Sequence, residues 1–198
     1  HGICTVQPIA SADASGLDSG PVSILITEGL PDAIPLNEVW SQLDLRDPRC
    51  RAVKNLIIDR VAHLVAHAHQ NGFEHTDLHA GNILLDDCSP GSYHALFVDL
   101  HNIRIGRPVS DRAVIRNLAQ FHQWFRPRAP LTDRLRFLDR YLYWREVYEP
   151  SGSFGRRLDY QPGDLRAALT QAVRVHADGL YAQRDRRCTR SGRYFTRL

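Results

Sequence analysis

The fold is decided by the stretch Phe73-Glu74-His75-Thr76-Asp77-Leu78-His79-Ala80-Gly81-Asn82-Ile83-Leu84-Leu85, which is followed shortly by Leu96-Phe97-Val98-Asp99-Leu100-His101. The first stretch carries Asp77 and, five residues later, Asn82, and the second carries Asp99, twenty-two residues after Asp77. Short apolar runs follow Asn82 and precede Asp99, and turn residues lie between the runs, so a β-hairpin is expected. Because of this hairpin, we expect Asn82 and Asp99 to lie at the same end.

These side chains suit the transfer of a phosphoryl group. Such a transfer needs a group that orients the attacking hydroxyl and cations that hold the phosphates. Asp77 stands in a polar loop after a buried helix, and we assign it to the acceptor hydroxyl as the catalytic residue. The amide oxygen of Asn82 can bind magnesium without adding charge, and Asp99 supplies the anionic oxygen that magnesium prefers. The sequence therefore predicts a phosphotransferase that uses ATP and Mg²⁺.

Hydrophobic periodicity predicts a mostly helical chain around a small hairpin. The expected elements are a buried strand at Val22–Thr27, a connector to Pro35, helices at 36–43 and about 53–70, hairpin strands at 83–85 and 95–98, helices at about 110–125 and 132–147, a Pro-, Gly- and Ser-rich loop at 150–155, and a last helix at about 164–184. The helix before the catalytic loop has the clearest apolar stripe, and Asn71-Gly72 ends it.

The composition is that of a globular protein, with 43% hydrophobic and 24% charged residues in a chain of 198. No apolar run approaches the ~20 residues of a membrane-spanning helix, and no secretory signal is visible. The four cysteines, at positions 4, 50, 88 and 188, form no CxxC pair and are expected to be reduced thiols. We therefore expect a cytoplasmic protein.

Two features of the sequence suggest a C-terminal piece of a larger protein. The chain begins with His1, and it contains no Met. Separately, Lys54 is its only lysine. Since nearly all other basic residues are arginines, Lys54 is the one residue that could serve as a nucleotide-binding lysine.

Positive charge gathers near the C-terminus, although the formal net charge is only +3. The arginines of this tail are Arg184, Arg186, Arg187, Arg190, Arg193 and Arg197. Such a tail could contact the phosphates of an anionic membrane, which would place the protein peripherally at the inner membrane face. A solvated, poorly ordered end is the alternative. We expect no nucleic-acid partner.

The segment His75-Thr76-Asp77-Leu78-His79-Ala80-Gly81-Asn82 resembles the catalytic loop of the protein-kinase-like superfamily. His79 stands where protein kinases usually carry Lys, which is closer to small-molecule and sugar kinases. The segment Val98-Asp99-Leu100-His101 occupies the place of Asp-Phe-Gly and resembles the lipopolysaccharide core kinases, the family of Kdo and heptose kinases. The strand at 24–26 running into 27–30 is similar to that family's hinge, and the Arg- and Leu-rich helix at 134–142 to its later helical region.

The resemblance implies an α+β, protein-kinase-like fold with a mostly helical C-lobe and a small catalytic β-hairpin. Residues 1–35 would be a remnant of the N-lobe with the hinge, and residues 36–198 the C-lobe with the basic tail. The backbone of Glu28 to Leu30 would bind adenine, Leu84 would form the floor of the adenine pocket, and His75 would brace the catalytic loop. The acceptor implied by the resemblance is a sugar or glycolipid, and within this class a lipopolysaccharide core sugar.

The chain departs from the family pattern at its N-terminal end. The Gly-rich loop, the strand lysine and its helix glutamate belong upstream of the strand at 22–27, where only twenty-one residues stand and none is a lysine. Lys54 lies after the hinge and is a poor substitute. The chain is therefore expected to be either a piece of a larger kinase or a minimal, degenerate member.

Two other classes of protein remain open. The alternation of His75, Asp77 and His79, followed by Asp99 and His101, could belong to a metal-dependent hydrolase. His63 and His67, four residues apart on a helix, could also bind a metal. A pseudokinase or binding module without turnover would keep the fold and the motifs. The residues themselves do not distinguish a core sugar from a protein serine, an aminoglycoside or another small alcohol as acceptor.

Overall fold

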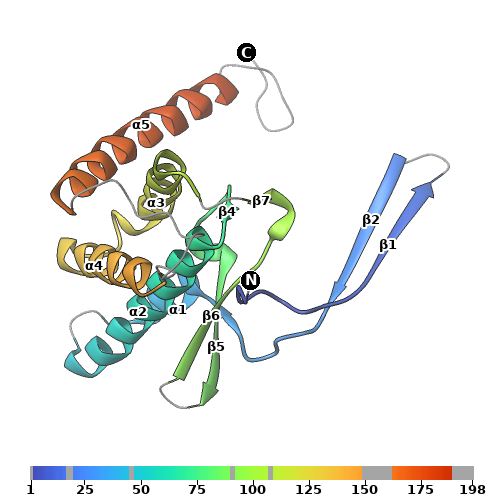
Figure 1. Cartoon of the computed structure of the whole chain (residues 1–198), viewed down its shortest axis with the longest axis horizontal. Coiled ribbons are helices and arrows are strands. Elements are labelled where there is room, and N and C mark those ends of the chain that lie inside the picture. The colour runs from blue at the N-terminus through green and yellow to red at the C-terminus, as the bar shows by residue number, and fades with distance from the viewer. Residues whose placement is uncertain are drawn as a thin grey trace.

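The computed structural model describes residues 2–16, 20–44, 47–89, 92–106, 109–148 and 162–188, and shows a helical body from which a two-stranded ribbon projects (Figure 1). The helices are α1 (Leu36–Gln42), α2 (Pro48–Gln70), α3 (Asp111–Phe125), α4 (Leu131–Val147) and α5 (Pro162–Cys188), with 3₁₀ turns η1 (Ala80–Asn82) and η2 (Leu100–Asn102). The strands are β1 (Pro8–Gly16), β2 (Gly20–Thr27), β3 (Ile34–Pro35), β4 (Phe73–His75), β5 (Ile83–Ser89), β6 (Ser92–Phe97) and β7 (Ile103–Ile105).

Helix α2 is the centre of the body. It begins at Pro48, whose fixed φ suits the first helical position, and the side chain of Asp47 caps it by accepting from the Arg49 N–H at 2.8 Å. It ends at Gln70 with Asn71 as its C-cap, after which Gly72 takes a φ of 74° that favours glycine. The apolar stripe expected from the sequence is buried, mainly against α4 and β6. The predicted helix and its stop signal are confirmed.

The small sheets bring the two motifs side by side. Strands β5 and β6 form the expected antiparallel hairpin, with Ile83 opposite Phe97, and β3 adds to its other edge. Strand β4, directly before the catalytic loop, pairs antiparallel with β7, directly after η2, so that His75 stands opposite Ile103. Strands β3, β4 and β7 are too short, at two or three residues, for periodicity to reveal them.

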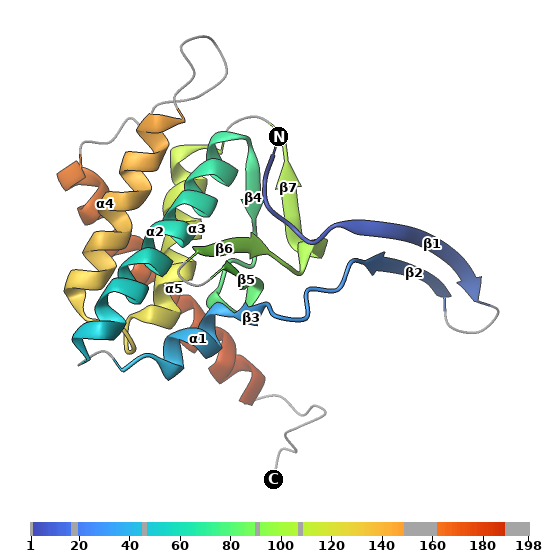
Figure 2. The same cartoon turned by 90° about the horizontal axis from the view of Figure 1, so that it is seen from below.

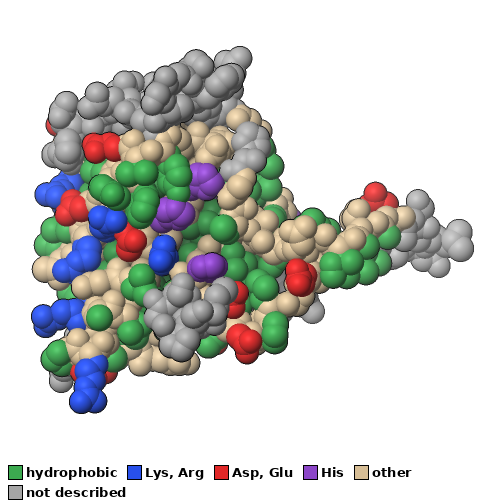
Figure 3. All heavy atoms as spheres, turned by 60° about the horizontal axis from the view of Figure 1, so that its bottom comes forward, with side chains coloured by type: hydrophobic (Ala, Val, Ile, Leu, Met, Phe, Trp, Pro, Cys, Tyr) green, Lys and Arg blue, Asp and Glu red, His purple; other side chains and the backbone are tan. Residues whose placement is uncertain are grey.

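The strand predicted at Val22–Thr27 is present, but the expectation that it is buried is wrong. Strand β2 forms there, but it pairs only with β1, in a segment for which we had predicted no strand. In β2, Ile24, Leu25 and Ile26 are 51%, 61% and 53% exposed. Hydrophobic side chains are visible along this ribbon, which extends away from the helical body (Figures 2 and 3). Their β propensity specifies a strand, but burial requires a second layer, and none lies over the ribbon in the described part of the chain.

The C-terminal half is helical, as the sequence predicts. Helices α3, α4 and α5 fall within a few residues of the expected ranges, and Ser110 and Pro130 are the N-caps of α3 and α4, without a side-chain capping hydrogen bond. The predicted loop at 150–155 lies outside the described residues, as do Arg190, Arg193, Arg197 and the side chains of the other tail arginines. Within the described ranges, no helix combines the length and apolar character needed to cross a membrane.

The lone lysine is buried between α2 and α4. Lys54 is 7% exposed, and its Nζ lies 2.8 Å from Oδ2 of Asp133, which is 3% exposed. Oδ1 of Asp133 accepts a hydrogen bond from Arg136 at 3.0 Å. Lys54 is therefore held in an ion pair inside the helical body, which agrees with the expectation that it is a poor substitute for a phosphate-binding lysine.

We expect Lys54→Met to lower the free energy of unfolding by about 3 kcal/mol, because it leaves the Asp133 carboxylate buried with only Arg136 as a cation. The double variant Lys54→Met, Asp133→Leu removes both buried charges and is expected to recover most of that loss. Chemical denaturation of the wild type and both variants measures the two effects. A single variant as stable as the wild type would contradict a buried ion pair at this position.

Candidate active site

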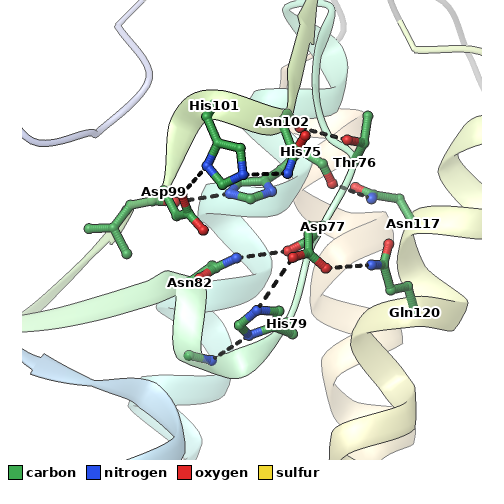
Figure 4. Close-up of polar contacts among 12 residues, drawn as sticks. His75, Thr76, Asp77, His79, Asn82, Asp99, His101, Asn102, Asn117 and Gln120 are labelled. Carbon is green, nitrogen blue, oxygen red and sulfur yellow. Dashed lines mark hydrogen bonds and ion pairs between the residues drawn. The ribbon is translucent and has the colours of Figure 1, made fainter. Parts of the chain in front are cut away.

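Asp77 lies in the loop between β4 and η1, and about half of its side chain is exposed. Its Oδ1 accepts a hydrogen bond of 3.1 Å from Nε2 of Gln120, which reaches across from α3 (Figure 4). Its Oδ2 lies 3.8 Å from Nε2 of His79, beyond hydrogen-bonding distance. One carboxylate oxygen is therefore held by a neutral amide, and the other has no hydrogen bond to a described residue.

Asn82 joins the catalytic loop to the hairpin. The residue is 6% exposed, and its Nδ2 donates to the main-chain oxygen of Asp77 at 3.0 Å. Its own main-chain oxygen accepts from the Val98 N–H at 3.0 Å, one residue before Asp99. Because Nδ2 is directed at Asp77, Oδ1 is the amide atom that remains for a cation, and no described residue donates to it.

Asp99 follows β6 in a left-handed backbone conformation, with φ 58° and ψ 56°. Among the described residues it is the one non-glycine with positive φ, a conformation that costs of order 1 kcal/mol and requires support from its surroundings. Asn102 Nδ2 donates to His101 Nε2 at 2.6 Å, so Nδ1 of that ring carries the proton that contacts Oδ1 of Asp99. The main-chain oxygen of Asn102 accepts from the N–H and the hydroxyl of Thr76, at 2.8 and 2.7 Å.

The structure thus brings the three residues assigned from the sequence into one region (Figure 4). Asn82 contacts the loop of Asp77 on one side and the segment leading to Asp99 on the other. The ring of His75 also links the two motifs, because its Nε2 donates to the main-chain oxygen of Val98 at 3.0 Å. His75 is 1% exposed, which fits a bracing role in the loop.

A buried row of polar side chains lies beneath the catalytic loop and was missed from the sequence. Asn117 Nδ2 donates to the main-chain oxygen of His75 at 2.7 Å, so its Oδ1 accepts from His69 Nε2 at 2.9 Å. That ring then has Nδ1 as an acceptor, and Tyr141 OH donates to it at 2.9 Å. The available signal was a histidine in the last turn of a buried helix, since buried polar groups need partners.

Burial keeps this row of side chains uncharged near neutral pH. Desolvation, with a smaller contribution from the Arg145 cation, lowers the pKa of His69 from 6.5 to about 4. Desolvation likewise raises the pKa of Tyr141 to about 12. Both side chains are therefore neutral at pH 7, which matches the hydrogen-bond directions assigned from the geometry.

The comparison with known families agrees with this geometry. The sequence profile described as the lipopolysaccharide kinase (Kdo/WaaP) family matches residues 1–141. The chain belongs to the lipopolysaccharide kinase (Kdo/WaaP) family. The family predicted from the catalytic-loop and Asp-Leu-His motifs is thereby confirmed.

A solved structure, WaaP in complex with acyl carrier protein, is similar to the chain with a TM-score of 0.65 and 21% sequence identity. The similarity covers 87% of this chain and 69% of that one. It shows a shared fold, so the predicted α+β, protein-kinase-like fold is confirmed. No curated protein matches the chain.

The segment that the family resemblance assigns to adenine leads into the hairpin. Glu28 is exposed, and its N–H donates to the Gln7 oxygen at 2.8 Å, which ties the segment to β1. Leu30 is half-buried and precedes β3, whose Pro35 pairs with Leu84 of β5. The pairing places the chain directly after this segment beside half-buried Leu84, and the adenine-binding roles of Glu28, Leu30 and Leu84 remain predictions.

The described histidines belong to no cluster that could hold a metal ion. Within the described ranges, no group of three or more His, Cys, Asp and Glu residues could hold a metal ion. His79 Nδ1 accepts from the Gly81 N–H at 3.1 Å, and His63 contacts the Tyr148 hydroxyl while its ring stacks 6.2 Å from that of His67. This arrangement disfavours the hydrolase interpretation. The oxygens of Asn82 and Asp99 are instead the hard donors that suit Mg²⁺ when phosphate oxygens complete the coordination.

The low pKa of His69 makes stability fall on acidification. The folded protein resists protonation until about pH 4, whereas the unfolded chain binds the proton near 6.5. The contribution of His69 to the free energy of unfolding is thus fully present above pH 6.5. It declines below that pH, by about 3 kcal/mol once pH 4 is passed. We expect His69→Asn to show a shallower decline in the free energy of unfolding between pH 6.5 and 4.

Denaturation midpoints measured across this pH range give the decline directly. Burial also lowers the pKa of His122 to about 4, so that residue stays in both proteins and its share cancels in the comparison. Equal pH slopes in the wild type and His69→Asn would contradict a buried neutral histidine.

Proposed function

We propose that this family member transfers the γ-phosphoryl group of ATP to a hydroxyl of a lipopolysaccharide core sugar. Membership of the lipopolysaccharide kinase family supports both the reaction class and the acceptor class. The observation that carries the proposal is the bond from Asn82 Nδ2 to the main-chain oxygen of Asp77. It couples a carboxylate suited to a hydroxyl with an amide oxygen suited to a cation, which are the two requirements of phosphoryl transfer.

In the proposed reaction Asp77 orients the acceptor hydroxyl and takes its proton through Oδ2. The hydroxyl oxygen forms a bond to the γ-phosphorus while the bond from that phosphorus to the bridging oxygen breaks, and ADP leaves with the electron pair. Asn82 Oδ1 and the Asp99 carboxylate would hold Mg²⁺, which supplies positive charge beside the phosphates. His101 fixes the Asp99 carboxylate by contact with Oδ1 and leaves Oδ2 for the cation.

The proposal also assigns a nucleotide-binding segment and a division of the chain into two lobes. The backbone of residues 28–30 would bind adenine against Leu84, at the junction between an N-lobe remnant with hinge (1–35) and a C-lobe (36–198). The protein would act at the cytoplasmic face of the inner membrane, where the glycolipid acceptor lies and where the basic tail could contact anionic headgroups.

The competing interpretation is a pseudokinase, which would keep these contacts without turnover. The decisive measurement must therefore include turnover.

We expect Mg-ATP to raise the melting temperature of the wild type, and Asp99→Ala to abolish the magnesium-dependent part of that shift, because the variant loses its anionic metal ligand. Asp77→Ala should keep the shift and lose phosphotransfer, because Asp77 acts on the acceptor and not on the cation. Thermal denaturation and ADP release from Mg-ATP measure the two effects. Full phosphotransfer by Asp77→Ala would rule out the mechanism, and binding without turnover in the wild type would favour the pseudokinase.

A second proposal concerns a cavity lined by residues of all five helices. Its volume is about 380 Å³, and its wall is mainly apolar, with side chains from α1 to α5 that include Ile57, Phe121 and Val173. Its lining also includes the arginines Arg126, Arg134, Arg166 and Arg174. The similar solved structure contains WaaP with acyl carrier protein. An apolar cavity with cationic groups suits an acyl chain on an anionic carrier, and we propose this class of partner for the chain.

We expect decanoate to raise the melting temperature of the wild type, because its chain fills the apolar cavity. Ala129→Phe, which places a ring into the cavity lining, should remove the shift. Ala167→Phe is the matched control, since Ala167 is exposed on α5 and lies outside the lining. Equal shifts in both variants would contradict binding in this cavity.

A further inference from the structure

Helix α3 carries two amide side chains three residues apart, Asn117 and Gln120, which places them on one face of the helix. Asn117 Nδ2 donates to the main-chain oxygen of His75 at 2.7 Å, and Gln120 Nε2 donates to Oδ1 of Asp77 at 3.1 Å. Figure 4 shows both side chains extending from α3 toward the catalytic loop. The two donors therefore contact the loop at its main chain and at its carboxylate.

We propose that Asn117 and Gln120, called here the α3 amide pair, are positioning residues for phosphoryl transfer. Asn117 sets where the catalytic loop lies against α3, and Gln120 sets the rotation of the Asp77 carboxylate. With Oδ1 occupied by Gln120, Oδ2 is the oxygen directed to the acceptor hydroxyl. The proposal rests on the proposed function, because it assigns the pair a role through Asp77.

The surroundings make the direction of each amide definite. Asn117 is 2% exposed, and its Oδ1 accepts from His69 Nε2 at 2.9 Å, so only Nδ2 can face the oxygen of His75. Gln120 must present Nε2 because its partner is a carboxylate oxygen, which only accepts. A reversed amide would place two acceptors in contact at either position. Each side chain therefore has one productive orientation.

An uncharged donor suits a carboxylate that must accept a proton. A neighbouring cation would favour the ionised form strongly and weaken the carboxylate as a base, whereas a neutral amide orients it with a smaller effect. Among the described residues, Gln120 is the one whose side chain donates to the Asp77 carboxylate within hydrogen-bonding distance, since His79 stands at 3.8 Å. Removing Gln120 should therefore free the carboxylate to rotate.

The helix supplies its own matched control. Gln123 is the next glutamine on α3, and its Nε2 donates to the main-chain oxygen of Val173 in α5 at 2.8 Å, away from the loop. Gln120→Leu and Gln123→Leu each remove one glutamine amide from the same helix and one hydrogen bond from the protein. A merely structural role for Gln120 would make the two variants alike in stability and in turnover.

The test measures steady-state ADP release from Mg-ATP without added acceptor, with water taking the phosphoryl group. We expect Gln120→Leu to lower kcat by about tenfold to a hundredfold, the range that misplacement of a reacting group produces. The KM for ATP should stay within about twofold of wild type, because the pair contacts neither proposed metal ligand through its side chains. Gln123→Leu should keep the wild-type kcat.

A second readout does not depend on turnover. In a ¹H–¹⁵N spectrum, the side-chain amide signals of Gln120 should move in Asp77→Ala, whereas those of Gln123 should not. Equal kcat in the two leucine variants, or an unmoved Gln120 signal, would overturn the positioning role while leaving the proposed function intact. A wild type that binds Mg-ATP and transfers the phosphoryl group neither to water nor to an added lipopolysaccharide core sugar would instead remove the proposed function, and the catalytic role of the α3 amide pair with it.

Discussion

The hydrogen bond from Asn82 Nδ2 to the main-chain oxygen of Asp77 is the interaction on which the rest of the site depends. A side-chain amide has one donor end and one acceptor end, so the bond that fixes Nδ2 also fixes the direction of Oδ1. The same residue accepts from the Val98 N–H, which connects the loop to the approach to Asp99. The main-chain and side-chain contacts of Asn82 therefore connect the loop that carries Asp77 to the segment that leads to Asp99.

Such a loop can be rigid only if its buried polar groups have partners. The main-chain oxygen of His75 and the His75 ring are inside the protein, and an unsatisfied group there would cost about 1–3 kcal/mol. Asn117 satisfies the oxygen, and the Val98 oxygen accepts from Nε2 of the ring, whereas Nδ1 of the ring is buried without a hydrogen-bond partner among the described residues. The neutral His69 and Tyr141 extend this support into α2 and α4, so the three helices α2, α3 and α4 together hold the loop.

The sequence predicted what local patterns encode. Asp77, Asn82 and Asp99 could be found because their spacing reflects a loop and a hairpin, and α2 because its apolar stripe has one period throughout. Gln120 could not be found in this way, because its role depends on a contact with a carboxylate 43 residues away. A glutamine on a helix gives no sign in the sequence of whether it contacts water or a distant side chain. The prediction that β2 is buried failed because a local pattern was taken to imply a tertiary contact. Ile24, Leu25 and Ile26 have strand propensity whether or not another layer covers them.

The negative charges of the proposed site require cations to offset them. Asp77 and Asp99 are carboxylates, and a nucleotide would bring further negative charge between them, so their mutual repulsion must be offset by cations. Lys54, the one lysine of the sequence, forms an ion pair with Asp133 between α2 and α4. Separating that pair would leave an unpaired charge buried inside the protein. In the described part of the chain, the side chains that hydrogen-bond to the two carboxylates are Gln120 and His101, and neither is a permanent cation. In the proposed reaction, a divalent cation held by Asn82 and Asp99 would offset part of this repulsion.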